Sequence, residues 1–311
     1  MASIRRSVGK ARKGMGELVR SARTLNATRA RQMELMEQTH KELVSIRREL
    51  FYQREYLNVL RYEAFSPTGR QVKALTDSVQ YDLRQTLELV AERKLSFARF
   101  GDGEFRTMFR YDYNLAFQPN SPELRAALRK VLSYDGYDAE RLLIGLPHPY
   151  LQNLHWQSVW LDMWEDFREV VDPEQKYGDA HVTRPVFFEQ LPDDGVDLWR
   201  RLWDGKRVCV VTGRNSRFEL LDEFFGNVRD AEFIHSVPTN AFEDVPRLVD
   251  EVKKTDADLF LIALGPAGTV LAAEASNAGK WAVDTGHLSN SWQHQVQKAP
   301  LPEKLPRIIG A

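Results

Sequence analysis

The chain has 311 residues, of which 43% are hydrophobic, so it can bury the core of one large or two medium-sized domains. Its formal net charge of −1 argues against a protein that coats nucleic acid. A single cysteine rules out a disulfide within the chain, and no uninterrupted apolar run is long enough to span a bilayer, so we expect a cytoplasmic protein.

Residues 1–31 are predicted to form a basic amphipathic helix. This segment holds nine Lys or Arg residues and one acidic residue, Glu17. Its apolar positions recur in alternating steps of four and three residues, at Ile4, Val8, Ala11, Met15, Leu18, Ala22 and Leu25. Such a helix favours peripheral contact with an anionic membrane surface. Nucleic-acid binding is the weaker alternative, because no aromatic residues are interleaved with the basic ones.

Residues 32–65 carry a heptad pattern. One seam position is apolar throughout and the other alternates polar and apolar residues: Met36, Leu43, Leu50 and Leu57 at the first, with Thr39, Ile46, Gln53 and Leu60 at the second. This pattern predicts a short coiled coil and therefore a homo-oligomer, most simply a parallel dimer. The alternative is that the stripe packs on the protein's own folded domain.

Strands and helices alternate in the rest of the chain. Ser66-Pro67-Thr68-Gly69 is predicted to break the N-terminal helix and to precede a domain over residues 71–295, with a tail over residues 296–311. Strands are expected at 95–100, 141–146, 207–212, 232–236, 259–264 and 281–283, and helices at 71–93, 122–133, 153–170, 196–203, 216–225, 244–254 and 268–278. The strands are almost entirely apolar and include Cys209 as a core residue. They predict an α/β domain whose mostly parallel sheet has helices on both faces.

The strand at 95–100 runs into a glycine turn that presents two carboxylates one residue apart, Gly101-Asp102-Gly103-Glu104. Two neighbouring acids repel each other unless a cation or hydrogen-bond donors compensate. Glycine on either side lets the backbone turn sharply and lets a ligand approach closely. The turn therefore predicts a divalent cation and a phosphate at Asp102 and Glu104. The alternative is an ordinary polar turn with Glu104 in the first turn of a helix.

Glycines and polar residues follow the other strands, at the edge of the sheet where such folds bind ligands. The turn Gly265-Pro266-Ala267-Gly268-Thr269 precedes a helix, whose free N–H groups favour a phosphate. Arg184, Arg214 or Arg217 could brace phosphates with bidentate contacts, although each also fits a surface arginine. Asn240 could be a ligand contact or only a turn residue.

Taken in order, these segments resemble the glycosyltransferases of the GT-D type. The resemblance covers residues 75–292 and rests on Arg99-Phe100-Gly101-Asp102-Gly103-Glu104-Phe105, Thr183-Arg184-Pro185, Asn240-Ala241-Phe242, Ala263-Leu264-Gly265-Pro266 with Thr269-Val270-Leu271-Ala272, and Asp284-Thr285-Gly286-His287. It implies a Rossmann-like domain that uses a nucleotide-diphosphate sugar, with Asp102 and Glu104 as the Asp-X-Glu motif at the metal and diphosphate. The nucleotide-binding residues then expected are Gly101, Gly103, Arg184, Gly213, Asn240, Gly265, Pro266 and Thr269. The sequence departs from the family pattern at residues 212–213, 265–269 and 288–291. These departures concern the identity of the sugar and of the acceptor more than the metal or nucleotide site.

We therefore expect a metal-dependent hexosyltransferase. It would use Mn²⁺ or Mg²⁺ to move a sugar from a UDP-sugar to a glycan, glycoprotein or lipid-linked acceptor in the synthesis of cell-surface polysaccharide or glycoconjugates. The cation would offset the charge that develops on the leaving diphosphate. An inverting reaction needs a base on the acceptor hydroxyl, and the candidates are Glu243, Asp244, Asp284 and His287. Two alternatives remain: a metal-independent Rossmann-like nucleotide enzyme such as a methyltransferase, and a non-catalytic coiled-coil scaffold with a degenerate α/β domain.

Overall fold

The computed structural model describes residues 2–214, 216–301 and 304, with side chains from Gly14 onward. The chain divides into two compact units, Met1–Ser66 and Pro67–Ala311. Within the described residues, no helix is both long enough and apolar enough to cross a membrane.

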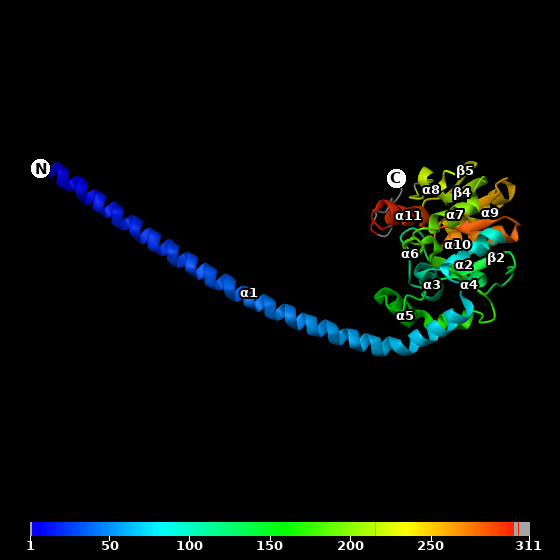
Figure 1. Cartoon of the computed structure of the whole chain (residues 1–311), viewed down its shortest axis with the longest axis horizontal. Helices are drawn as coiled ribbons and strands as arrows, with labels where there is room; N and C mark the ends of the chain where they lie inside the picture. Colours follow the sequence, from blue (N-terminus) through cyan, green and yellow to red (C-terminus); the bar gives the residue numbers. More distant parts are fainter. Residues whose placement is uncertain (1, 215, 302–303, 305–311) are drawn as a thin grey trace. The chain divides into compact units, whose positions relative to one another are not determined.

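The first unit consists of helix α1 (Ala2–Val79), which continues into the second unit (Figure 1). The predicted basic helix is helical in the structure, although its side chains before Gly14 lie outside the described residues. The four residues of the first heptad seam position are exposed to between 58% and 72%: Met36, Leu43, Leu50 and Leu57. Within the described residues of the first unit, these four apolar side chains therefore form one exposed stripe.

The predicted helix break at residues 66–69 is wrong, because α1 continues through Pro67. A proline inside a helix loses one backbone hydrogen bond and crowds the carbonyl four residues earlier. The turns after it bury Val72, Thr76 and Val79, and this burial offsets the cost. The predicted single helix over residues 71–93 is also wrong. Gln80 instead forms a β-bridge with Tyr177, and a new helix, α2 (Leu83–Glu92), begins after the N-cap Asp82.

The second unit contains one sheet of seven strands in the order β3-β2-β1-β7-β6-β4-β5. The strands are β1 (Ser96–Arg99), β2 (Leu142–Leu146), β3 (Gly178–Asp179), β4 (Arg207–Gly213), β5 (Asp230–Ser236), β6 (Leu259–Ala263) and β7 (Ala282–Asp284). All pairs among these described strands are parallel. The predicted α/β class with a parallel sheet is therefore confirmed. The sequence pattern missed β3, because two residues are too few to show a period.

Helices cover both faces of this sheet (Figure 1). One layer consists of α3 (Asp102–Phe109), α4 (Pro122–Leu132), α5 (Leu154–Val170), α9 (Val245–Lys254) and α10 (Pro266–Asn277). The other consists of α2, α6 (Pro185–Gln190), α7 (Gly195–Trp203), α8 (Asp222–Phe225) and α11 (Leu288–Gln297). Two short 3₁₀ helices, η1 (Ala180–Thr183) and η2 (Ala241–Asp244), follow β3 and β5.

The core between α7 and the sheet is rich in aromatic rings. Trp199 and Trp203 are fully buried and stack on each other, and Phe224 packs edge-on against Trp203. On the opposite face α10 approaches the sheet closely because it consists mainly of small residues. A Cβ at Gly268 would lie 3.2 Å from the Ile262 side chain. Cys209 is buried in β4, as predicted for a core residue.

The segment after β4 differs from the prediction of a helix over residues 216–225. Only Asp222–Phe225 is helical, as α8. The Ser216 hydroxyl accepts a hydrogen bond from the Phe218 backbone N–H, a local turn that competes with helix formation. Residues 216–218 are thereby held in a loop beside the end of β4.

Candidate functional site

A cavity of about 200 Å³ lies at the carboxyl ends of β1, β4, β6 and β7. Its lining combines cationic side chains from Arg99, Arg214 and Arg217 with apolar walls from Phe117, Phe218, Val237 and Leu264. Gly213 and Gly265 leave backbone exposed in the wall. An apolar pocket with guanidinium groups at its rim suits a ligand with a flat ring system and negative charge.

Gly265 shapes the cavity because its backbone conformation requires glycine. Its φ is +56°, and a Cβ there would lie 2.8 Å from the ring of Phe117. Phe117 belongs to the loop between α3 and α4, which is attached to the segment after β5. The Asn240 N–H donates to the Phe117 carbonyl at 2.7 Å, and the Gln118 side-chain amide donates to Asn240 Oδ1 at 2.8 Å. The Asn240 side chain therefore fastens this loop.

A buried ion pair stands at the back of the cavity. Arg99 Nε lies 3.4 Å from Asp284 Oδ1, and the Asp284 side chain is almost entirely buried. Thr269 donates to the Arg99 carbonyl and to Asp284 Oδ2, and the Gly286 N–H donates to Asp284 Oδ1. Burial raises the pKa of Asp284 to about 6, although the Arg99 guanidinium opposes this shift.

The two carboxylates of the acidic turn have different partners. Glu104 is buried and its Oε2 accepts the N–H of the N-cap residue Gly101 at 2.8 Å. This is one half of a capping box at the start of α3, since glycine has no side chain to complete it. Burial raises the pKa of Glu104, against the opposing effect of Arg99. Asp102 is 39% exposed, and its Oδ2 lies 3.2 Å from Nε2 of His155. Asp102 is therefore the acid of this turn that a bound ion can reach.

Arg184 interacts electrostatically both with the carboxylates of the acidic turn and with Arg99 and His287, which line the cavity. Burial lowers the pKa of Arg184 to about 10, as does the charge of Arg99, whereas Asp102 and Glu104 oppose the shift. His287 lines the cavity, and burial together with Arg184, Arg99 and Arg217 lowers its pKa to about 3. His287 is thus a neutral and weakly basic imidazole in this surrounding.

The structure brings together only some of the predicted site residues. Gly213, Gly265 and His287 line the cavity, together with Arg99, which was not singled out as a site residue. Pro266 and Thr269 are buried behind the wall, and Gly101 and Gly103 lie in the acidic turn. Glu243 is exposed on η2, outside the set of described residues that line the cavity. Asp244 accepts the Ser236 hydroxyl and pairs with Arg247.

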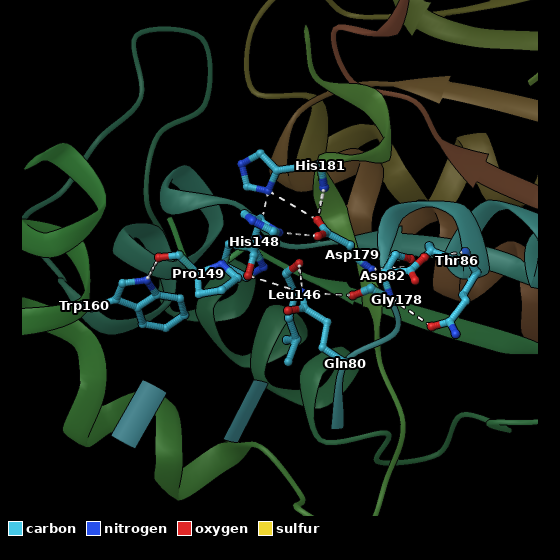
Figure 2. A network of polar contacts seen from close by, with 12 residues as sticks. Gln80, Asp82, Thr86, Leu146, His148, Pro149, Trp160, Gly178, Asp179 and His181 are labelled. Carbon is cyan, nitrogen blue, oxygen red and sulfur yellow. Dashed lines mark hydrogen bonds and ion pairs between the residues drawn. The ribbon is translucent and has the colours of Figure 1, made fainter. Parts of the chain in front are cut away.

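A polar network at the ends of β2 and β3 was missed by the sequence analysis (Figure 2). Asp179 is 2% exposed, and its Oδ2 lies 2.8 Å from His148 Nδ1. Its Oδ1 accepts the His181 N–H, and the His148 N–H donates to His181 Nδ1. The two histidines are 33 residues apart in sequence, so only the pairing of β2 with β3 reveals that they meet.

Within the described residues, no group of three or more His, Cys, Asp or Glu side chains has an arrangement that could hold a metal ion. Mg²⁺ and similar ions often use one or two carboxylates and take their other ligands from water and substrate phosphates. Asp102 has the oxygen ligand that such an ion prefers, and it is partly exposed. The residues present therefore fit an ion that arrives with a phosphate-bearing ligand.

Comparisons with known proteins agree on one family. A family model described as the glycosyltransferase GT-D fold matches residues 97–307. The chain is 24% identical over 221 residues to glycosyltransferase GlyD of Streptococcus pneumoniae, and 26% identical over 240 residues to a probable glycosyl transferase, Gly, of Streptococcus gordonii. These matches cover 67% and 73% of this chain but only 26% and 33% of the two streptococcal proteins. The chain therefore spans about a third or less of the relatives it matches.

Solved structures share the fold. A structure described as showing that the highly conserved domain of unknown function 1792 has a distinct glycosyltransferase fold aligns with a TM-score of 0.68 at 23% identity, over 78% of this chain and 88% of that one. A glycosyltransferase with the same domain from Streptococcus sanguinis aligns with a TM-score of 0.64 at 25% identity, over 71% of this chain and 85% of that one.

Proposed function

Because the chain belongs to the family of the glycosyltransferase GT-D fold, we propose that it transfers a hexose from a nucleotide-diphosphate sugar, with UDP as the nucleotide, in a reaction that depends on Mn²⁺ or Mg²⁺. The observation that carries this proposal is the cavity at the ends of β1, β4, β6 and β7. It has apolar walls for a base and a sugar ring, and the arginines Arg214 and Arg217 for a diphosphate.

Each part of the site has a role in this reaction. Phe117, Phe218 and Val237 form walls for the base, and Arg214 and Arg217 would pair with the phosphates. Asp102, with Glu104 behind it, would hold the cation, which offsets the charge of the departing diphosphate. The acceptor is proposed to be a glycan, a glycoprotein or a lipid-linked saccharide used to build cell-surface polysaccharide or glycoconjugates.

Thermal unfolding in the presence of nucleotide sugars tests the donor and the metal together. We expect UDP-sugars with Mn²⁺ to raise Tm, since a ligand at one hundred times its Kd adds about 2.7 kcal/mol to the free energy of unfolding. EDTA should remove most of the shift, because the cation held by Asp102 would offset the charge of the diphosphate and so strengthen its binding. Free adenosine and S-adenosylmethionine are the controls. A shift with S-adenosylmethionine and none with any nucleotide sugar would contradict the proposal.

The exposed stripe of α1 supports a second proposal, that the protein is a parallel homodimer at the cytoplasmic face of an anionic membrane. Met36, Leu43, Leu50 and Leu57 are all more than half exposed, and a parallel pair would bring two basic segments of residues 1–31 to one end.

We expect light scattering to give a dimer for the full chain and a monomer for residues 67–311. Only the full chain should sediment with liposomes that contain phosphatidylserine, and salt should weaken this binding. A monomeric full chain would contradict the coiled coil, and equal sedimentation of both chains would contradict the membrane role.

A further inference from the structure

We propose that His148, held by Asp179, is the base that takes the proton from the acceptor hydroxyl, and that the open hollow along residues 148–153 is where the acceptor saccharide binds. This inference rests on the proposed function, because a glycosyl donor must be present for the acceptor to attack. The four candidates from the sequence are poorly suited to this role. Asp284 is buried in an ion pair, His287 is weakly basic, Glu243 lies outside the cavity, and Asp244 is paired with Arg247.

The hydrogen bonds define which ring nitrogen of His148 is basic. Asp179 is buried, and although burial itself opposes ionisation, the hydrogen bond from His148 and the neighbouring His181 lower the pKa of this carboxyl. Its Oδ1 also accepts the His181 backbone N–H. An ionised Asp179 can only accept, so His148 Nδ1, at 2.8 Å, carries the proton. The basic lone pair is then on Nε2. The same arrangement orients an imidazole and stabilises its protonated form in many enzymes.

His181 has a different role from His148. Its Nδ1 accepts the His148 backbone N–H at 2.9 Å, so this nitrogen is unprotonated. Burial lowers the pKa of His181, which favours the neutral ring. Only His148 is substantially exposed, at 34% of its side chain, compared with 10% for His181 and 2% for Asp179. Among the described residues, the charged and titratable groups near His148 include Asp179 from β3, His181 from η1 and Tyr150 from its own loop. Arg184 and Glu189 act electrostatically on Tyr150, and Arg184 also acts on His181.

Side-chain hydrogen bonds hold the loop that carries His148 (Figure 2). Gln80 donates to the Leu146 carbonyl, Trp160 Nε1 donates to the Pro149 carbonyl, and Gln157 donates to the Leu151 carbonyl. Residues 148–153 line an open hollow of about 620 Å³. A preformed loop of this kind can hold a base at a fixed position without ordering it anew in each cycle.

An aromatic surface beside His148 fits a saccharide. The Tyr150 ring stacks at 6.0 Å on Trp156 and meets the rings of His148 and His181 edge-on, both at 4.7 Å. Tyr150 has a φ of +42°, an unusual conformation for a large residue, and it is held there by these contacts. Sugar rings pack their C–H faces on such aromatic surfaces, while their hydroxyls need polar partners nearby, here the imidazole of His148.

The proton and electron balance of the step is simple. The acceptor oxygen forms a bond to the anomeric carbon while its proton moves to His148 Nε2. The bond from the anomeric carbon to the diphosphate oxygen breaks, and the nucleoside diphosphate leaves with the electron pair. The imidazolium, stabilised by Asp179, later releases its proton to water. His148 is thus the catalytic residue, and Asp179 is a positioning residue.

The decisive variant is His148→Asn. Its amide can still donate to Asp179, so the fold and the donor site should be preserved, but it has no basic nitrogen. We expect nucleotide release from UDP-sugars, with p-nitrophenyl glycosides or water as acceptor, to fall by about 10²–10⁴-fold. The Mn²⁺-dependent thermal shift given by the UDP-sugar should be unchanged. The matched control is His235→Asn on the exposed edge of β5, which should keep full turnover.

Two further readouts separate a base from a structural role. Imidazole added to His148→Ala should restore part of the turnover, and kcat/KM of the wild type should rise with pH along a limb that His148→Asn lacks. Asp179→Asn should lower turnover and alter that pH limb while the donor still binds. A wild-type chain that neither binds nor turns over a nucleotide sugar would overturn the proposed function, and this inference with it. Donor turnover by His148→Asn equal to wild type would overturn this inference alone.

Discussion

Asp102→Asn is expected to lower sugar transfer by about 10²–10³-fold, the typical effect of removing one electrostatic contact to a developing charge. The side chain is 39% exposed and its one described ion-pair partner is His155, so the loss of its charge should leave the fold intact. The part of the nucleotide-sugar thermal shift that depends on Mn²⁺ should disappear as well. Turnover at saturating Mn²⁺ and the thermal shift with and without the metal measure both effects.

Two companion variants sharpen this test. Glu104→Gln keeps an acceptor for the Gly101 N–H and so preserves the turn while removing the second charge. Asp112→Asn, an exposed acid in the following loop, is the matched control and should behave as wild type. Full turnover by Asp102→Asn would exclude Asp102 as the metal ligand, whereas equal losses in the two turn variants would assign the ion to both acids.

Arg99→Met is expected to destabilise the protein by about 3–5 kcal/mol at pH 8, because it leaves Asp284 as a buried charge without its guanidinium partner. Urea unfolding gives this free energy directly. The double variant Arg99→Met with Asp284→Asn should recover part of the loss, since it removes the unpaired charge as well. Arg125→Met on α4 offers a control, an arginine with a side-chain hydrogen bond to Asn120 outside the ion pair.

The cost of Arg99→Met should depend on pH in a defined direction. The pKa of Asp284 is raised to about 6 in the folded protein, so its carboxyl binds a proton more readily when folded than when unfolded. Above pH 6 the ionised Asp284 therefore lowers the free energy of unfolding, and this destabilisation is lost as the pH falls below 6 and the carboxyl is protonated. Without Arg99 its pKa rises further. The stability difference between wild type and Arg99→Met should thus be smaller at pH 5 than at pH 8, and a larger difference at pH 5 would contradict the ion-pair role.

The fold could be predicted largely from local patterns. Buried parallel strands appear as continuous apolar runs, such as Leu142–Leu146 and Leu259–Ala263, and these were identified correctly. Pro67 misled the prediction because local propensity favours a break there, whereas the burial of Val72 and Val79 depends on tertiary packing. The short β3 lies below the length at which a period can be recognised. The helix predicted over residues 216–225 was too long, because the local turn at Ser216 competes with helix formation and only Asp222–Phe225 is helical.

For the candidate site, the sequence indicated which residues lie at the ligand-binding edge of the sheet but not which contacts their side chains make. Residues that directly follow strands, such as Gly213, Gly265 and His287, were placed at the right edge because a parallel sheet brings those ends together. The role of each residue at this edge of the sheet depends on where its side chain points, and the sequence does not specify that direction. Asn240 was expected at the nucleotide, and in the structure its side chain accepts a hydrogen bond from Gln118, a contact that the sequence did not indicate. Asp179 follows a strand too short to be recognised, so its contact with His148 had no signal in the sequence.

The position of β7 has a consequence for how the chain is assembled during synthesis. This strand comes after the other six described strands in the sequence, yet it lies between β1 and β6 in the middle of the sheet. Until residues 282–284 have left the ribosome, the strands can form only two separate half-sheets, β3-β2-β1 and β6-β4-β5, whose inner edges expose unpaired backbone groups. The two halves then join late through contacts distant in sequence, which is slow. The nascent domain is therefore open to aggregation until its last strand is inserted, and the two halves of the cavity wall meet only at that moment.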